Sequence, residues 1–313
     1  MAGLEGRVNS EPSPGPELAV VVPTRNRPQH AVDCARAILA TAGFSELIVV
    51  DQSPGDETRL ALDALADPRL RYVRSSLKGA ANGRNAGIDS SRAELIAFTD
   101  DDCRVTADWA SNIVRIFRGD AQVAIVCGRV TVPEDIARQG FAGTFEPVVR
   151  EWQHRYPPPG PEWGITANFA ARRSALDQVG AFDPMLGVGA PLLAGEEPDL
   201  LFRVLRAGFK VINATEVHVE HLGVRAPGAE TRALWFAYTA GTAAALVKHV
   251  RLGDVEGARL YASWLSKTAA EVVKSLYLGR RPTGAGLLKG FVSGSIASLK
   301  FGIDRERKMY EAR

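Results

Sequence analysis

Short apolar runs alternate with amphipathic stretches between residues 18 and 127. The runs are rich in Val, Ile and Leu and lie at residues 18–22, 47–50, 70–73, 95–98 and 123–127. Uninterrupted runs of this length are typical of strands that are buried on both faces. Between the first two runs, apolar residues recur at helical spacing from Val32 to Leu39, and Pro28 stands where a first helical turn tolerates proline. This alternation predicts an α/β fold, with a mostly parallel sheet and helices on both faces.

The pattern changes twice in the remainder of the chain. Residues 133–163 contain many prolines and predict a loop-rich insertion. Regular structure resumes at residues 164–171, and a helix is predicted over 198–207, followed by strands over 209–212 and 216–219. From residue 226 the pattern is helical to the last residue, 313. We therefore expect a disordered N-terminus over residues 1–17, one main domain over 18–225 and a helical C-terminal region over 226–313.

Composition favours an ordinary globular protein of the cytoplasm. Hydrophobic residues make up 46% of the 313 residues and charged residues 24%. Residues 1–17 contain no apolar stretch and predict neither a signal peptide nor a membrane anchor. The three cysteines, Cys34, Cys103 and Cys127, lack the spacing of a zinc site and fit reduced thiols. The most apolar run, residues 233–247, is shorter than the roughly 20 residues of a membrane-spanning helix.

Positive charge is concentrated in the C-terminal part of the chain. The whole chain has a formal charge of +2, but residues 231–313 hold fourteen basic and six acidic residues. Any attraction to an anionic surface therefore belongs to this part. Its helices are expected either to pack on the main domain or on a second subunit, or to lie on the inner face of an anionic membrane. We expect no nucleic-acid partner.

Polar segments follow three of the predicted strands. They are residues 23–27 (PTRNR), residues 51–53 (DQS) and the triplet Asp100-Asp101-Asp102. Ligands of open α/β sheets bind beyond the carboxyl ends of the strands, where these segments would meet. Either of the first two could equally be a solvated turn. Three adjacent carboxylates repel one another, and a divalent cation such as Mg²⁺ or Mn²⁺, shared with substrate phosphates, is the usual reason to retain them.

Three further features are candidates for chemistry. Residues 80–87 are small, and Arg84 among them could pair with a phosphate or a carboxylate, although neither a Walker loop nor a dinucleotide fingerprint is present. Glu196 and Glu197 open a predicted helix, where acidic residues favour the helix dipole but could also supply a general base near the acidic triplet. His218 and His221 follow at the end of a predicted strand. A histidine there is more often structural, but His221 could complete a metal site or touch a phosphate.

Together these segments resemble glycosyltransferase family 2, whose members have a GT-A fold. The matching segments, in chain order, are residues 20–26 (VVVPTRN), 48–53 (IVVDQS), 83–88 (GRNAGI), 96–102 (IAFTDDD), 168–173 (NFAARR), 179–183 (VGAFD) and 195–203 (GEEPDLLFR). Each segment alone is common, whereas seven in this order are specific. The resemblance covers residues 18–225, which would form the GT-A catalytic domain, with a nucleotide-binding half over 18–130 and an acceptor half over 164–225.

The resemblance implies a role for each residue that matches the family pattern. The donor, a nucleotide-diphosphate sugar, would contact Pro23, Thr24, Arg25, Asp51 and Arg84. Many family members have an aromatic residue at the position of Arg25, so stacking on the nucleotide base is not expected there.

The acidic triplet corresponds to the family's D-x-D element. Asp102 would hold the divalent cation, Mn²⁺ or Mg²⁺, with Asp100 or Asp101 nearer the ribose. His221 stands where the family often has a histidine and would be a second metal ligand.

The implied reaction is a single displacement that inverts the anomeric carbon. Glu197 occupies the place of the catalytic base, where the family usually has aspartate after a glutamate, and Glu196 is the neighbouring candidate. The acceptor would be a hydroxyl of a glycan, a lipid-linked sugar or a small molecule, in the biosynthesis of a polysaccharide, glycolipid or other glycoconjugate.

Two other functions are compatible with such a sheet. A nucleotidyltransferase would also use a metal and a nucleotide, but it usually has a glycine-rich, basic loop after the first strand, and residues 23–26 contain no glycine. A catalytically silent module that only binds a nucleotide sugar would be expected to lose the acidic triplet or the base. This chain retains both.

Overall fold

The computed structural model describes residues 17–153, 156, 163–278 and 284–311. The predicted N-terminal disordered segment, residues 1–17, lies outside this range except for Glu17, and part of the predicted loop-rich insertion, 133–163, also lies outside it. The first half of the fold has the expected alternation. Its elements are β1 (Leu18–Thr24), α1 (Pro28–Leu39), β2 (Glu46–Asp51), α2 (Glu57–Asp63), β3 (Leu70–Arg74), α3 (Ala80–Ser90) and β4 (Leu95–Phe98).

The second half has shorter and more irregular elements. They are β5 (Cys103–Val105), α4 (Trp109–Gly119), β6 (Val123–Thr131), α5 (Glu134–Ala137), β7 (Glu151–Trp152), the 3₁₀ helix η2 (Thr166–Asn168), β8 (Phe169–Arg172), α6 (Arg173–Val179), α7 (Glu196–Arg206) and β9 (Lys210–His221). The two strands predicted over 209–212 and 216–219 are one continuous strand, β9. The predicted helix 198–207 begins two residues earlier, so Glu196 and Glu197 form its first turn.

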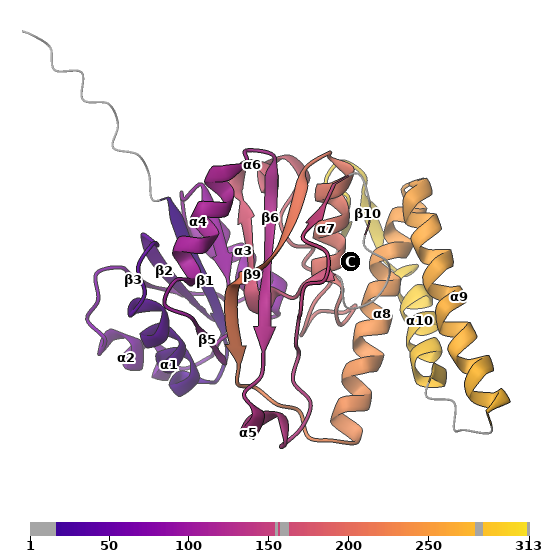
Figure 1. Cartoon of the computed structure of the whole chain (residues 1–313), viewed down its shortest axis with the longest axis horizontal. Coiled ribbons are helices and arrows are strands. Elements are labelled where there is room, and N and C mark those ends of the chain that lie inside the picture. Colours follow the sequence, from indigo (N-terminus) through magenta and orange to yellow (C-terminus); the bar gives the residue numbers. More distant parts are fainter. Residues whose placement is uncertain (1–16, 154–155, 157–162, 279–283, 312–313) are drawn as a thin grey trace, which may run out of the picture.

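Within the described residues, one nine-stranded sheet has the order β3-β2-β1-β4-β8-β6-β9-β5, with β7 also pairing with β9. The α/β fold is confirmed (Figure 1). The strands β3, β2, β1 and β4 are mutually parallel, as expected. The other half is mixed, because β8 runs antiparallel between β4 and β6.

The C-terminal region consists of α8 (Ala229–Arg251), α9 (Val255–Tyr277) and α10 (Gly284–Ser298), and a hairpin of β10 (Gly302–Asp304) and β11 (Met309–Glu311). The three helices lie at the end of the molecule beyond α7 (Figure 1). The prediction of helix to the last residue is therefore wrong for the hairpin. Asp304 accepts hydrogen bonds from the backbone N–H groups of Glu306 and Arg307, which favours a turn, and Lys308 has a positive φ of 54°.

Helix α8 is the buried member of this group. It packs on α7 on one side and on α10 on the other, where Gly290 and Gly294 allow a close approach to its backbone. Ala243, Ala244 and Ala245 are almost completely buried. No helix within the described residues combines the length and apolarity needed to cross a membrane.

Candidate active site

The polar segments predicted to meet at the carboxyl edge of the sheet lie on neighbouring strands. Thr24 and Asp51 are register partners at the ends of β1 and β2. The acidic triplet follows β4, the other neighbour of β1. Cys103, directly after the triplet, is the register partner of His221 at the end of β9. The sheet therefore brings His221 to the triplet across more than one hundred residues of sequence.

Two carboxylates of the triplet are paired with an arginine that the sequence did not single out. Arg27 donates from Nη1 to Asp101 Oδ1 at 3.0 Å and to Asp102 Oδ2 at 3.2 Å. Thr24 Oγ1 donates to the other oxygen of Asp101 at 2.7 Å. The signal for Arg27 was weak, because it is one of two arginines in a polar loop. Its neighbour Arg25 is exposed and makes no hydrogen bond or ion pair with other described residues.

The protonation of the triplet depends on opposing effects. Burial raises the pKa of Asp101, and the charge of Asp102 adds to this shift. Burial also acts to raise the pKa of Asp102, but hydrogen bonding to His221 and the charges of His221 and Arg27 outweigh it, so this pKa is lowered. Burial acts to lower the pKa of His221, and the contact with Asp102 raises it overall. Asp102 is therefore the carboxylate best kept ionised.

The arrangement around Asp102 fits a divalent cation. His221 Nε2 lies 3.2 Å from Asp102 Oδ1. One ligand atom each from Asp102, Cys103 and His221 lie within 4.8 Å of one another. Gly223 passes so close that a Cβ there would lie 2.8 Å from the Asp102 carboxyl carbon. Carboxylate oxygens suit Mg²⁺ and Mn²⁺, and a neutral imidazole is a common metal ligand. Arg27 is the other positive group on the same carboxylate. His218 instead lies 2.8 Å from Thr131 Oγ1, which fits a structural role.

A buried arginine joins the two acidic clusters. Arg84 is 3% exposed and donates from Nη2 to Asp100 at 3.0 Å and from Nη1 to Glu196 at 3.3 Å. Its Nε has no hydrogen-bond partner within the described part of the chain. Arg84 thus binds carboxylates in this structure, which was one of the two roles left open for it. The acidic pair at the start of α7 consequently lies beside the triplet.

The two glutamates differ in environment. Glu196 is buried, and burial together with the charge of Glu197 raises its pKa to about 8. Glu197 is only partly buried, and its Oε1 accepts hydrogen bonds from the backbone N–H and the hydroxyl of Thr166 at 3.2 and 2.8 Å. One carboxylate is enclosed with Arg84, and the other remains accessible with a fixed orientation.

The remaining predicted donor contacts, Asp51 and Pro23, lie at the same sheet edge. Asp51 is fully buried and accepts hydrogen bonds from Tyr72 Oη at 3.0 Å and from the backbone N–H of Ser53 at 2.9 Å. A Cβ on Gly83 would lie 2.9 Å from Pro23 Cβ, so the start of α3 packs directly against Pro23. Asp51 and Pro23 therefore form part of the sheet edge at the carboxyl ends of β1 and β2.

Three aromatic side chains that contact one another, one of which lies near the acidic pair, were not identified as site residues from the sequence. The ring centroid of Trp235 lies 5.3 Å from that of Phe141 and 6.0 Å from that of Tyr238. Trp235 and Tyr238 are 44% and 38% exposed. Burial of the phenol and the charges of Glu197 and Glu196 raise the pKa of Tyr238 to about 12, consistent with its position near these carboxylates.

Residues 19–180, more than half of the chain, match the family model described as Glycosyl transferase family 2. This chain belongs to glycosyltransferase family 2. The resemblance inferred from the seven motifs is thereby confirmed.

Curated relatives match this family 2 chain over limited lengths. The succinoglycan biosynthesis protein ExoO of Rhizobium meliloti is 32% identical over 113 residues, 35% of this chain and 32% of that protein. A GalNAc(5)-diNAcBac-PP-undecaprenol beta-1,3-glucosyltransferase of Campylobacter jejuni is 31% identical over 106 residues, 32% of this chain and 34% of that protein. The pre-mycofactocin glycosyltransferase of Mycobacterium tuberculosis is 26% identical over 208 residues, 64% of this chain and 42% of that protein. The match therefore spans well under two thirds of each relative.

Solved structures share the fold. A mannosyltransferase from Pyrobaculum calidifontis, PcManGT, solved with GDP-Man and Mn²⁺, superposes with a TM-score of 0.59 at 17% identity, over 91% of this chain and 86% of that one. GalNAc-T7, solved with UDP, GalNAc and Mn²⁺, gives a TM-score of 0.54 at 13% identity, over 75% of this chain and 48% of that one. The expected GT-A architecture is confirmed.

The raised pKa of Glu196 predicts a pH-dependent stability. The folded-state value of about 8 lies above the ordinary value of 4.5, so the folded protein binds this proton more tightly than the unfolded chain. The stabilisation is fully present below pH 4.5 and is lost as the pH rises to about 8. Relative to Glu196→Gln, the wild-type free energy of unfolding should fall over this range by at most about 1.4 kcal/mol per pH unit.

Urea denaturation at several pH values measures this difference. Asp89→Asn, which changes an exposed acid on α3, is the matched control and should keep the wild-type pH dependence. Parallel pH profiles for wild type and Glu196→Gln would show that the pKa of Glu196 is not raised in the folded protein.

Proposed function

We propose that this chain is an inverting, metal-dependent glycosyltransferase that transfers a sugar from a nucleotide-diphosphate donor to an acceptor hydroxyl. The observation that carries the proposal is the ion-pair bridge from Asp100 through Arg84 to Glu196. It holds a carboxylate pair suited to general-base chemistry against a carboxylate cluster suited to a cation. Family membership favours sugar transfer over nucleotide transfer, and the retained carboxylates favour an enzyme over a silent binding module.

On the donor side, Asp102 and His221 would hold Mn²⁺ or Mg²⁺, which as a Lewis acid would offset the charge of the departing diphosphate. Arg27 would contribute a second positive charge there, since it already contacts Asp101 and Asp102. Pro23, Thr24, Arg25 and Asp51 would border the nucleotide, and Asp100 or Asp101 the ribose. The complexes of PcManGT with GDP-Man and Mn²⁺ and of GalNAc-T7 with UDP, GalNAc and Mn²⁺ support this type of donor and ion.

On the acceptor side, Glu197 would act as the general base. Its Oε1 is held by Thr166 and its side chain also hydrogen-bonds with Glu196, but Glu197 is only partly buried, so this oriented carboxylate would accept the proton of the acceptor hydroxyl. As that oxygen forms its bond to the anomeric carbon, the bond to the diphosphate breaks and the electron pair leaves with the diphosphate. Attack opposite to the leaving group inverts the anomeric carbon. Buried Glu196 would remain with Arg84 and fix the start of α7.

The aromatic cluster of Phe141, Trp235 and Tyr238 would receive the acceptor. Exposed aromatic faces beside a base offer an apolar surface to the C–H face of a sugar ring, and exposed apolar patches commonly mark binding sites. Relatives named for succinoglycan biosynthesis and for transfer to an undecaprenol-linked glycan support a saccharide acceptor in polysaccharide or glycoconjugate biosynthesis.

The outer helices α9 and α10 would contact an anionic membrane from the cytoplasmic side. Val273, Leu276 and Tyr277 are each more than 60% exposed near the end of α9. Exposed Lys267 and Lys274 lie on the same helix. Apolar side chains flanked by lysines favour binding at the surface of an anionic bilayer. A second copy of the chain, the other partner left open by the sequence, would use the same surface.

The donor reaction is tested first with common nucleotide sugars and Mn²⁺ or Mg²⁺. Wild type should bind and turn over one donor only with the ion present, and Asp102→Asn should lose metal-dependent binding. Glu197→Gln should keep the donor affinity but lower kcat by roughly 10²–10⁴-fold, because the general base is removed. Asp89→Asn is the control. A folded wild-type protein that binds no donor would instead support a silent module.

The acceptor surface is tested by kinetics with a saccharide acceptor at saturating donor. Trp235→Ala should raise the acceptor KM by about tenfold, because the loss of one aromatic stacking contact is worth roughly 0.5–1.5 kcal/mol beyond its buried area. The donor KM should stay unchanged, as it should in Leu60→Ala, which removes an exposed apolar side chain on α2. Equal changes in the two KM values would contradict an acceptor role.

Membrane contact is tested by co-sedimentation with vesicles of anionic or neutral phospholipid. Wild type should bind the anionic vesicles preferentially. The double variant Lys267→Glu/Lys274→Glu should bind at least roughly 30-fold more weakly, because each of the two basic residues near such a surface contributes about 1 kcal/mol. Arg36→Glu changes an exposed basic side chain on α1, outside the C-terminal helices, and this variant should bind like wild type. Equal loss in both variants, or a dimer without lipid binding, would contradict the membrane contact.

A further inference from the structure

Helix α8 contacts the turn that carries the candidate base at two points. Gly241 and Lys248 are seven residues apart, which is two helical turns, so both lie on the same face of α8. Gly241 approaches the residue before Glu196, and Lys248 binds Asp199 one turn further along α7. The C-terminal region therefore contacts both the start and the interior of α7.

The first point is a contact between two backbones. A Cβ on Gly241 would lie 2.6 Å from Ala194 Cα, and a Cβ on Gly195 would lie 2.5 Å from the Gly241 carbonyl oxygen. Gly195 also has a positive φ of 97°, which other residues rarely adopt. Glycine is therefore required on both sides of this contact. Any bulk added there must displace the peptide that leads into Glu196.

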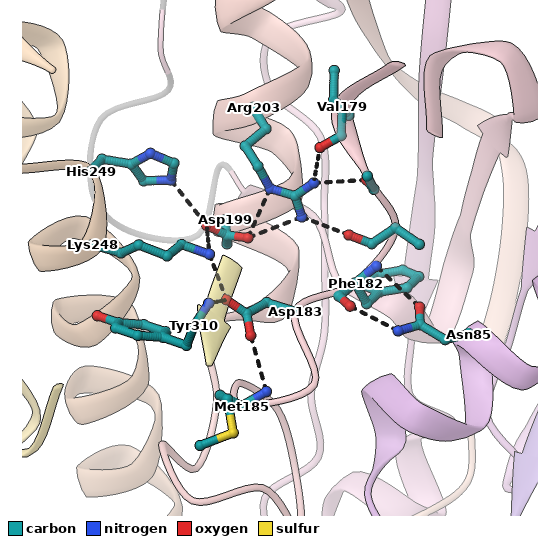
Figure 2. Close-up of polar contacts among 12 residues, drawn as sticks. Asn85, Val179, Phe182, Asp183, Met185, Asp199, Arg203, Lys248, His249 and Tyr310 are labelled. Atoms are coloured by element: carbon teal, nitrogen blue, oxygen red, sulfur yellow. Dashed lines mark hydrogen bonds and ion pairs between the residues drawn. The ribbon is translucent and has the colours of Figure 1, made fainter. Parts of the chain in front are cut away.

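The second point is a buried ionic network (Figure 2). Lys248 Nζ lies 2.6 Å from Asp183 Oδ2 and 2.7 Å from Asp199 Oδ1. His249 Nε2 lies 2.9 Å from the same oxygen of Asp199, and Arg203 binds its other oxygen at 3.0 Å. The lysine thus links α8 simultaneously to α7 and to the segment after α6.

The charges in this network balance without solvent. Asp183, Asp199 and Lys248 are fully buried, and Arg203 and His249 are 2% and 3% exposed. Burial lowers the pKa of His249, so the imidazole is favoured in its neutral form. Two carboxylates are then matched by one lysine and one arginine. Loss of a single partner would leave an uncompensated buried charge.

The network also reaches the arginine that joins the acidic clusters. Phe182, next to Asp183, exchanges two hydrogen bonds with Asn85: its carbonyl accepts at 2.8 Å and its N–H donates at 3.1 Å (Figure 2). Asn85 is the neighbour of Arg84 on α3. Arg203 donates to the carbonyl oxygens of Val179, Gly180 and Ala181 at 2.6–2.7 Å. Helices α3, α7 and α8 are therefore fixed to one segment, residues 179–183.

We propose that α8 positions the candidate base, with Gly241 and Lys248 as positioning residues, and that the catalytic unit extends beyond residue 225 to include this helix. The inference rests on the proposed function for its kinetic consequences. The claim that α8 keeps the first turn of α7, with Glu196 and Glu197, in a fixed position does not depend on the proposed function. The outer helices α9 and α10 are not part of this assignment.

The first test compares Gly241→Ala with Gly286→Ala in the full chain. Both substitutions replace a helical glycine by a better helix former, but a Cβ at Gly286 meets nothing within 4 Å. Gly241→Ala should lower kcat by roughly 10- to 100-fold, as misplacement of a catalytic group does, and leave the donor KM within about twofold. Gly286→Ala should match wild type. Parallel loss of donor binding and kcat in Gly241→Ala would overturn the positioning role.

The second test removes Lys248 while retaining charge balance. Lys248→Met alone leaves two carboxylates against one arginine and is expected to lower the melting temperature, whereas Asp183→Asn/Lys248→Met restores neutrality and should recover part of the loss. The double variant should still show lower kcat at an unchanged donor KM, because α7 has lost its ion pair to α8, although the His249–Asp199 hydrogen bond and the Gly241 contact remain. Lys210→Met removes a lysine–aspartate pair of 2.9 Å at the opposite end of β9 and should keep wild-type kcat.

Hydrogen exchange separates this inference from the proposed function. Amides of residues 194–200 should exchange faster in Gly241→Ala and in the double variant than in Gly286→Ala and Lys210→Met. That result would support positioning by α8 even if the wild type transferred no sugar. Exchange rates equal to those of the controls, or a wild-type kcat in the folded double variant, would overturn it.

Discussion

The guanidinium of Arg84 is the contact on which the candidate site depends, because it binds Asp100 and Glu196 and so joins the two acidic clusters. Asp100 comes from the end of β4 and Glu196 from the start of α7, 96 positions later in the chain. Arginine suits this position because its planar fork presents several fixed donors and stays charged when buried. With Arg84 enclosed between them, both clusters can lie at one edge of the sheet.

The same balance of charge explains the division of roles among the acidic residues. Glu196 is buried beside Glu197 and has a raised pKa, whereas Glu197 is oriented by Thr166 and remains accessible. Asp102 has a lowered pKa because His221 and Arg27 outweigh its burial. Identical or similar side chains thus acquire different properties from their surroundings, which is how one site can hold both a base and a cation.

The buried network around Lys248 adds a long-range constraint to this local one. Buried ion pairs contribute little net stability compared with apolar packing, but they fix geometry strictly, since each partner must remain matched. Lys248 connects α8 to Asp183 and Asp199, and Gly241 allows the helix backbone to approach the turn before Glu196. The start of α7 is consequently held by Arg84 on one side and by α8 on the other.

The sequence by itself determined the parts of this protein that depend on local pattern. Apolar runs predicted β1, β2, β3, β4 and β6, and the order of the seven motifs indicated the family and its GT-A fold. The position of the acidic triplet after a buried strand placed it at the ligand-binding edge, because the carboxyl ends of parallel strands share that edge. The glutamates at the start of α7 were likewise identified from their position before an amphipathic helix.

Only the tertiary structure decided how these parts meet. The antiparallel insertion of β8, the pairing of Arg27 with the triplet and the packing of Trp235 against Phe141 and Tyr238 leave no periodic signal in the sequence. In the sequence, Lys248 is one of several basic residues of the C-terminal helices. In the structure it is completely buried between Asp183 and Asp199, which lie 65 and 49 positions earlier. Periodicity reports which face of an element is apolar. The partner of a buried charge is set by packing between elements distant in sequence, so it becomes visible only once the chain has folded.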